Sequence, residues 1–213
     1  MKIGVLGSGT VGQAFAAKLT EQGQDVMIGT RSPAKLQAWA AEHPGVRIGS
    51  FNDTAAHGEI VFNATKGDAA LEVLKSAGEA NLNSKILIDI SNPLDFSQGM
   101  PPSLFVSNTD SLGEQIQRAF PRARVVKSFN TLTAHLMVNP HALADGDHTL
   151  FLSGNDADAK ATVTRLFAEW FGRRDILDVG DISTARGTEA LLPIWVRLFM
   201  KFGRANFQFK IVR

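Results

Sequence analysis

The stretch that decides the fold is at the N-terminus, where residues 1–12 have the sequence MKIGVLGSGTVG. Residues 3–6 form a short apolar run typical of a buried strand, residues 7–12 match the pattern GxGxxG, and residues 11–22 place apolar side chains at helical spacing. In such a strand–turn–helix, one glycine permits the tight turn, one lets the backbone approach a pyrophosphate, and one permits close helix packing. The sequence therefore predicts a dinucleotide site, with a glycine-rich turn that binds nothing as the alternative.

Apolar runs and helical patterns alternate along most of the chain, which is typical of βαβ units on a parallel sheet. A helix is expected to begin at Ser32 and Pro33, and another covers residues 156–171. Further strands are predicted over residues 25–29, 46–49, 59–64, 85–90, 124–129, 148–153 and 174–179. The fold class is therefore α/β, with a doubly wound and mostly parallel sheet.

The residues after the second strand distinguish NAD from NADP. An NAD site usually carries Asp or Glu about 20 residues beyond the glycine turn, where it accepts hydrogen bonds from the ribose 2′-OH. Residues 28–33 read IGTRSP and contain no acid. The Arg31 guanidinium can pair with a 2′-phosphate, Thr30 and Ser32 can donate to it, and Lys35 adds charge. The sequence favours NADP; the alternative is that Ser32 caps the helix and Arg31 is solvated.

Small polar residues follow three of the predicted strands. They are Asn63-Ala64-Thr65, Ser91-Asn92-Pro93-Leu94 and Phe129-Asn130-Thr131. The carboxyl ends of parallel strands meet at one edge of the sheet, where the reactive half of a dinucleotide binds. We expect these amides and hydroxyls, as a set, to fix a carboxamide, although any one of them is also an ordinary strand end.

Side chains for proton chemistry are few. The chain has no Cys and no Tyr, which excludes thiolate nucleophiles, Cys-ligated metals, disulfides and reductases that use a Tyr proton donor. No catalytic residue is assigned; His135, in a predicted helix start, is a candidate for substrate contact beside the alternative of a packed or solvent-facing side chain. Lys127 lies in an alternating strand, where we expect it exposed or paired. The five His show no ligand spacing with carboxylates, so no metal is expected.

The composition is that of a globular protein. Hydrophobic residues make up 44% and charged residues 20%, and a net charge of +1 offers no electrostatic basis for binding nucleic acid. No window holds about 18 consecutive apolar residues, so no transmembrane helix is expected. The N-terminal apolar run is too short for a signal peptide, and we therefore expect a cytoplasmic protein.

Two segments interrupt the alternation of strands and helices. Residues 91–109 show no clean period, which favours a binding loop or lid over plain surface. Residues 190–213 hold five aromatic and five basic residues and no acid, and a helix predicted over 191–202 is too apolar to stand alone on a surface. We expect this helix to be buried against the sheet or a second subunit. A membrane-surface anchor is the alternative.

Four motifs in this order resemble the coenzyme F-420-dependent NADP oxidoreductase family. They are GSGTVG at 7–12, GTRSP at 29–33, VVKSFNTL at 125–132 and GDISTARGTEALLPIWVRL at 180–198. The chain is also similar to the oxidoreductase domain of the six-transmembrane metalloreductases. The resemblance implies a Rossmann domain in residues 1–180 that binds NADP. It further implies a helical C-terminal segment in residues 181–213 that completes the substrate pocket, a homodimer interface, or both.

The resemblance also implies the activity: an NADPH-dependent oxidoreductase that transfers hydride directly between NADP(H) and a small-molecule acceptor, coenzyme F-420 deazaflavin or a flavin. The alternatives are a reductase of a small imine or ketone and a non-catalytic module that binds or senses NADP. The sequence differs from the archaeal members of the family in two places: its glycine loop is short, and residues 63–68 read NATKGD. These differences bear on the identity of the second substrate more than on the binding of NADP. The predicted cofactor-binding residues are Gly7, Ser8, Gly9, Thr10, Val11, Gly12, Thr30, Arg31, Ser32, Lys35, Ala64, Thr65, Asn92, Pro93 and Asn130.

Overall fold

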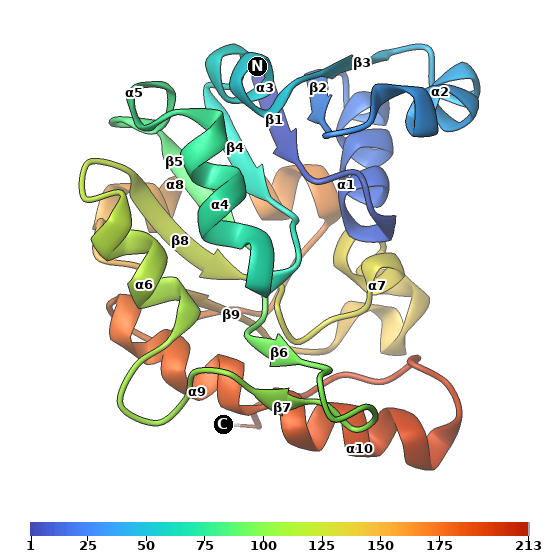
Figure 1. The fold of residues 1–213 in the computed structure, drawn as a ribbon. Coiled ribbons are helices and arrows are strands. Elements are labelled where there is room, and N and C mark those ends of the chain that lie inside the picture. Colours follow the sequence, from blue (N-terminus) through green and yellow to red (C-terminus); the bar gives the residue numbers. More distant parts are fainter. Residues whose placement is uncertain (213) are drawn as a thin grey trace.

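The computed structural model describes residues 1–212 and contains an eight-stranded sheet in the order β10-β9-β8-β5-β4-β1-β2-β3 (Figure 1). The strands are β1 (Lys2–Leu6), β2 (Asp25–Gly29), β3 (Val46–Gly49), β4 (Ile60–Asn63), β5 (Ile86–Asp89), β8 (Arg124–Ser128), β9 (Leu150–Ser153) and β10 (Ile176–Asp178). All neighbouring strands pair in parallel except β8 and β9, which are antiparallel. The order β3-β2-β1-β4-β5-β8 is that of a doubly wound sheet, so the predicted Rossmann α/β fold is confirmed.

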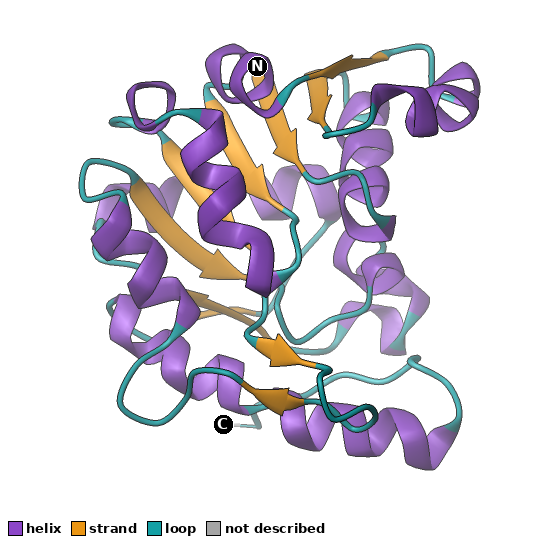
Figure 2. Cartoon of the chain, in the orientation of Figure 1, coloured by secondary structure: helices purple, strands orange, loops and turns teal. Residues whose placement is uncertain are grey.

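Helices cover both faces of this sheet (Figure 2). They are α1 (Thr10–Glu21), α2 (Pro33–Glu42), α3 (Phe51–His57), α4 (Gly67–Ala77), α5 (Glu79–Leu82), α6 (Leu112–Ala119), α7 (Ala134–Val138), α8 (Ala157–Phe171), α9 (Ala185–Ala190) and α10 (Leu192–Phe202). Three short 3-10 helices are η1 (Pro140–Ala142), η2 (Ala144–Gly146) and η3 (Ile182–Thr184). Successive side chains of a strand point to opposite faces, so Val5 joins the core beneath α1 and α8 while Leu6 joins the core beneath α3, α4 and α6. Burial on both faces explains why the strands are continuous apolar runs.

The segment 91–109 contains more regular structure than its sequence predicts. Strands β6 (Leu94–Asp95) and β7 (Ser103–Leu104) form an antiparallel hairpin, with Leu94 opposite Leu104. Each strand has two residues, which is too short for an alternating pattern to be recognisable. The hairpin leaves Phe96, Met100 and Phe105 exposed.

The C-terminal segment packs on the sheet domain along only part of its apolar surface. Leu192 and Val196 of α10 are buried, whereas Ile194, Phe199, Met200 and Phe202 are 37–53% exposed. The chain then returns to the sheet, where the Thr149 amide donates to the Phe209 carbonyl at 3.0 Å. Burial of the predicted helix against the sheet is therefore only partial. Within residues 1–212, no helix has the length and apolar character needed to cross a membrane.

Phe15 of α1 lies at the centre of the larger core. Its ring centroid lies 5.1 Å from those of Phe62 and Phe129 and 5.6 Å from that of Phe171, and its side chain is fully buried.

We expect Phe15→Ala to lower the free energy of unfolding by about 3–5 kcal/mol, because it removes a large side chain from a packed core. Urea denaturation measures this loss. The matched change Phe96→Ala, at a residue 56% exposed, is expected to cost within about 0.5 kcal/mol; equal losses would contradict this account of the core.

Candidate functional site

The glycines of the first turn have three different surroundings. Gly7 has φ +108°, and a Cβ there would lie 2.6 Å from the carbonyl oxygen of Ala64. A Cβ at Gly12 would lie 1.8 Å from the carbonyl oxygen of Gly7, so α1 packs directly on the turn. A Cβ at Gly9, by contrast, would meet no atom within 4 Å. The first and third glycines are thus required by packing, while the second leaves room for a group to approach the backbone.

The N-terminus of α1 faces this free space. Gly9 is the N-cap, no side chain caps the helix, and the first turn contains no acidic residue. The helical ladder begins with the Gln13 amide donating to the Gly9 carbonyl at 2.9 Å, so the amides of residues 10–12 have no acceptor within the helix. The positive end of the helix dipole adds to their attraction for an anion. The turn therefore fits a pyrophosphate.

The turn after β2 is tied to the glycine turn. The Ser8 hydroxyl donates to Thr30 Oγ1 at 2.9 Å, and the Ser32 amide donates to the same oxygen at 3.1 Å. Ser32 occupies the N-cap of α2, but its side chain makes no capping hydrogen bond, so capping does not occupy its hydroxyl. Arg31 and Lys35 are exposed and have no ion-pair partner among residues 1–212. Two cations and a free hydroxyl beside the Ser8–Thr30 contact fit the 2′-phosphate of NADP.

A cavity of about 860 Å³ opens at the carboxyl ends of β4 and β5, beside α1. This is where the strand order reverses between β1 and β4, the usual ligand position in a doubly wound sheet. Its walls are mostly apolar, and the hairpin closes one side with Phe96 and Phe105. The lining residues are Val11, Ala64, Thr65, Lys66, Gly67, Asp68, Leu71, Ile90, Ser91, Asn92, Leu94, Asp95, Phe96, Ser97, Phe105, Leu112, Gln115, Leu132 and Met137.

Four of the predicted cofactor residues line this cavity: Val11, Ala64, Thr65 and Asn92. Asn92 forms a reciprocal amide contact with Asn130. The Asn92 side-chain amide donates to the Asn130 carbonyl at 2.7 Å, and that of Asn130 donates to Asn92 Oδ1 at 3.1 Å. Asn130 is 4% exposed, and neither it nor the buried Pro93 is among the lining residues. Asn130 therefore lies behind Asn92.

His135 is not brought to the cavity. It is exposed on α7, whereas its neighbours Leu136 and Met137 are buried and Met137 lines the cavity. The titratable lining residues are Lys66, Asp68 and Asp95. Hydrogen bonds from the Ser97 backbone amide and side chain hold the pKa of Asp95 below its ordinary value, so this carboxyl is ionised at neutral pH and is not a proton donor.

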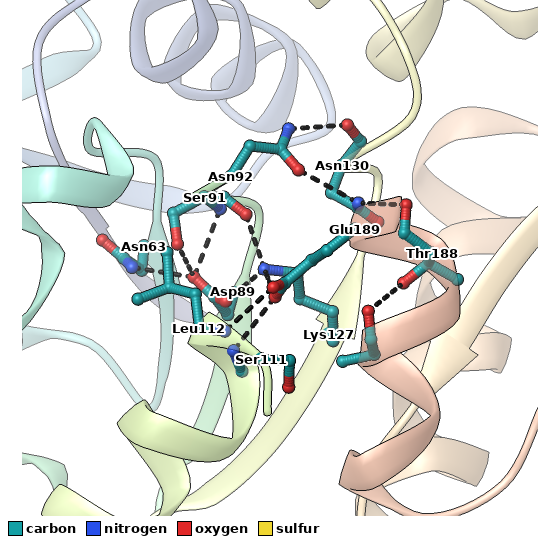
Figure 3. A network of polar contacts seen from close by, with 12 residues as sticks. Asn63, Asp89, Ser91, Asn92, Ser111, Leu112, Lys127, Asn130, Thr188 and Glu189 are labelled. Carbon is teal, nitrogen blue, oxygen red and sulfur yellow. Dashed lines mark hydrogen bonds and ion pairs between the residues drawn. The ribbon is translucent and has the colours of Figure 1, made fainter. Parts of the chain in front are cut away.

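A cluster of buried charged residues, which no local sequence pattern indicates, lies beside Ser91 and Leu112 of the cavity wall (Figure 3). Lys127 of β8 is paired, as one alternative predicted, but it is 1% exposed and lies between Asp89 of β5 and Glu189 of α9. Both Nζ–oxygen distances are 2.8 Å. The only signal for Glu189 in the sequence is that it is the sole acidic residue after Asp181.

Comparison with known proteins agrees with this geometry. Residues 2–93 match the family model described as NADP oxidoreductase, coenzyme F420-dependent. The crystal structure of a protein from Arthrobacter sp. FB24, assigned as an F420-dependent NADP reductase, is 55% identical, covers 100% of both chains and has a TM-score of 0.97.

Two further relatives are more distant. Metalloreductase STEAP3 from Rattus norvegicus is 30% identical over 97% of this chain and 41% of that protein, so the chain spans about two-fifths of the length of this curated relative. An imine reductase from Aspergillus terreus is 19% identical over 94% of this chain and 63% of that one, with a TM-score of 0.68, and shares the fold.

The glycine turn, the doubly wound sheet and the cavity at its switch point are those of a dinucleotide-binding protein of the Rossmann type. The chain belongs to the coenzyme F420-dependent NADP oxidoreductase family. This membership places it among the NADP-dependent oxidoreductases.

Replacing Gly12 and Gly9 separately by alanine should distinguish the glycine that packing requires from the glycine that ligand binding requires. Gly12→Ala is expected to destabilise the fold severely, because its Cβ would overlap the Gly7 carbonyl. Gly9→Ala should leave the melting temperature nearly unchanged, since its φ of −77° suits alanine and its Cβ meets no protein atom. It should nevertheless weaken NADPH binding by about tenfold or more, because the methyl group blocks approach to the α1 amides. Thermal unfolding and NADPH titration measure the two effects; unchanged NADPH affinity in Gly9→Ala would contradict a pyrophosphate at this turn.

Proposed function

We propose that the chain transfers hydride directly between NADP(H) and a deazaflavin or flavin-type acceptor. The observation that carries this proposal is the cavity of about 860 Å³, which opens beside the α1 N-terminus and has mostly apolar walls. Such a cavity suits two planar rings held against each other. The family description, which names NADP and coenzyme F420, supports the same pairing.

In this proposal the protein binds NADP(H) at three places. The backbone of Gly7 to Gly12 holds the pyrophosphate, and Thr30, Arg31, Ser32 and Lys35 surround the 2′-phosphate. Ala64, Thr65 and Asn92 face the nicotinamide, with Pro93 and Asn130 behind them. NADPH, when bound, supplies the hydride. The residues of the chain orient the ring and exclude water from it.

The cavity offers few side chains for protonating a carbonyl or imine substrate, because its titratable lining residues are Lys66, Asp68 and Asp95 alone. Asp95 is held in its ionised form, and His135 is exposed on α7 outside the cavity. Reduction of a small imine or ketone normally requires a proton near the reacting carbon. Hydride exchange between two rings makes a smaller demand on acid–base side chains, so the geometry favours a deazaflavin or flavin over those substrates.

We propose that residues 181–213 support the cavity from behind and supply an interface. The lining residues all fall between Val11 and Met137, so this segment acts through contacts such as the Asn130 amide donating to the Thr188 carbonyl at 3.0 Å. The exposed apolar residues of α10, such as Ile194 and Phe199, suit burial in a homodimer.

Loss of the Arg31 guanidinium should change cofactor selectivity. Arg31→Ala is expected to weaken NADPH binding by about 10- to 100-fold, which corresponds to one lost charge-assisted contact, and to leave NADH binding unchanged. Isothermal titration with both nucleotides measures this. Arg165→Ala, which removes an exposed arginine paired with Glu169 on α8, is the matched control and should change neither affinity. Equal weakening of NADPH and NADH by Arg31→Ala would contradict a 2′-phosphate contact.

A panel of acceptors tests the reaction itself. With NADPH as donor, we expect reduction of coenzyme F420 or of a free flavin to be at least about tenfold faster than reduction of small cyclic imines or ketones. Stopped-flow absorbance follows NADPH oxidation. His135→Ala should leave the rate unchanged because the residue lies outside the cavity. Rapid turnover of imines alone would support the imine reductase alternative, and binding of NADPH without any turnover would support the sensing module.

A further inference from the structure

Lys127 uses all three of its ammonium protons inside the protein. Its Nζ lies 2.8 Å from Asp89 Oδ2, 2.5 Å from the Ser91 carbonyl oxygen and 2.8 Å from Glu189 Oε1. Burial alone would lower the pKa of Lys127, but the two carboxylates outweigh it and hold the pKa above its ordinary value. The side chain is therefore a fixed cation and has no proton free for a substrate.

The partners of Lys127 belong to segments that form the site. Asp89 ends β5, and its Oδ1 accepts hydrogen bonds from the Ser91 amide and hydroxyl at 3.2 and 2.7 Å. Ser91 lines the cavity, and Asn92 follows it directly. Lys127 thus contacts this loop twice, once through Asp89 and once through the Ser91 carbonyl. The loop that carries Asn92 is therefore held by the ammonium group.

Glu189 connects the same ammonium group to two other parts of the site. Its carboxylate accepts from the Leu112 amide at 2.8 Å and from the Gly113 amide at 3.0 Å, at the N-terminus of α6. Leu112 lines the cavity. The residue before Glu189, Thr188, accepts at its carbonyl from Asn130. One buried junction therefore joins the β5 loop, the start of α6 and α9, and both asparagines of the amide pair are attached to it (Figure 3).

We propose that Lys127 and Glu189 are positioning residues that fix the Asn92–Asn130 pair at the nicotinamide end of the cavity. This inference rests on the proposed function only in that NADP binds the cavity. Neither residue touches the cofactor in this proposal; each acts through the segments it joins. The adenosine end of the cofactor, held by the glycine turn and Arg31, does not depend on the junction.

Binding of two ligands tests this proposal without requiring turnover. NADP⁺ reaches both ends of the site, whereas adenosine 2′,5′-bisphosphate lacks the nicotinamide half. We expect Glu189→Gln to weaken NADP⁺ binding by about 5- to 20-fold and to change binding of the bisphosphate by less than about twofold. Lys127→Met should give a larger difference of the same kind, because it leaves two buried carboxylates without their cation. Isothermal titration measures both ligands.

Glu189→Gln should fold, because it leaves the neighbouring ion pairs in place. Glu189→Gln retains the Asp89–Lys127 pair, and Arg186 on α9 still pairs with Glu114 of α6 at 2.6 and 2.8 Å. The matched control is Lys160→Met. Like Lys127, Lys160 contacts a carboxylate and a backbone carbonyl, those of Asp178 and Gly180, but it does not line the cavity. This control should change neither affinity.

Three outcomes of these titrations distinguish the positioning role from the proposed reaction. If folded Glu189→Gln binds both ligands as the wild type does, or loses both equally, the positioning role is overturned. If the wild-type protein binds NADP⁺ and the variants lose it selectively while no acceptor is reduced, the positioning role stands and the proposed reaction fails. If the wild-type protein gains no affinity from the nicotinamide half of NADP⁺, the positioning role is overturned, and the acceptor panel alone decides the proposed reaction.

Discussion

The close approach of backbone to backbone at the first turn is the constraint on which the rest of the structure depends. Only a residue without a Cβ fits at Gly12, against the carbonyl of Gly7, and at Gly7, against the carbonyl of Ala64. These contacts bring together the end of β1, the start of α1 and the end of β4. Val11 of α1 and the residues that follow β4 and β5 therefore line one cavity, and the Ser8–Thr30 contact holds the turn after β2 beside the glycine turn.

A cluster of buried charged residues lies behind the wall of this cavity. The buried ions of Asp89, Lys127 and Glu189 satisfy one another and nearby backbone groups behind the wall, while the wall itself is largely apolar. Buried charges with complete sets of partners resist rearrangement, so they define a position without offering a proton. A chain with neither Tyr nor Cys can therefore serve a reaction in which position and exclusion of water matter more than acid–base chemistry.

The parts of the molecule that could be predicted from the sequence are those with local patterns. The glycine turn, the residues after β2 and the buried strands are each encoded by residues that are close together in the sequence. The observed sheet agrees with the doubly wound sheet predicted from them. The Lys127–Glu189 contact joins residues 62 positions apart, so no local pattern reveals it. The hairpin of β6 and β7 is too short to show periodicity. For α10, the sequence shows an apolar helix but not which side the sheet domain covers.

Transfer of an isotopic label tests direct hydride exchange most closely. Deazaflavins form a stable carbon–hydrogen bond at C5 on reduction, so a deuterium delivered there is retained. NADPH carrying deuterium at either face of nicotinamide C4 is mixed with oxidised coenzyme F420 in ordinary water, and the product is examined by mass spectrometry and NMR. The account predicts that one of the two labelled cofactors places its deuterium at C5. Reduced product that takes its C5 hydrogen from solvent with both cofactors would contradict it.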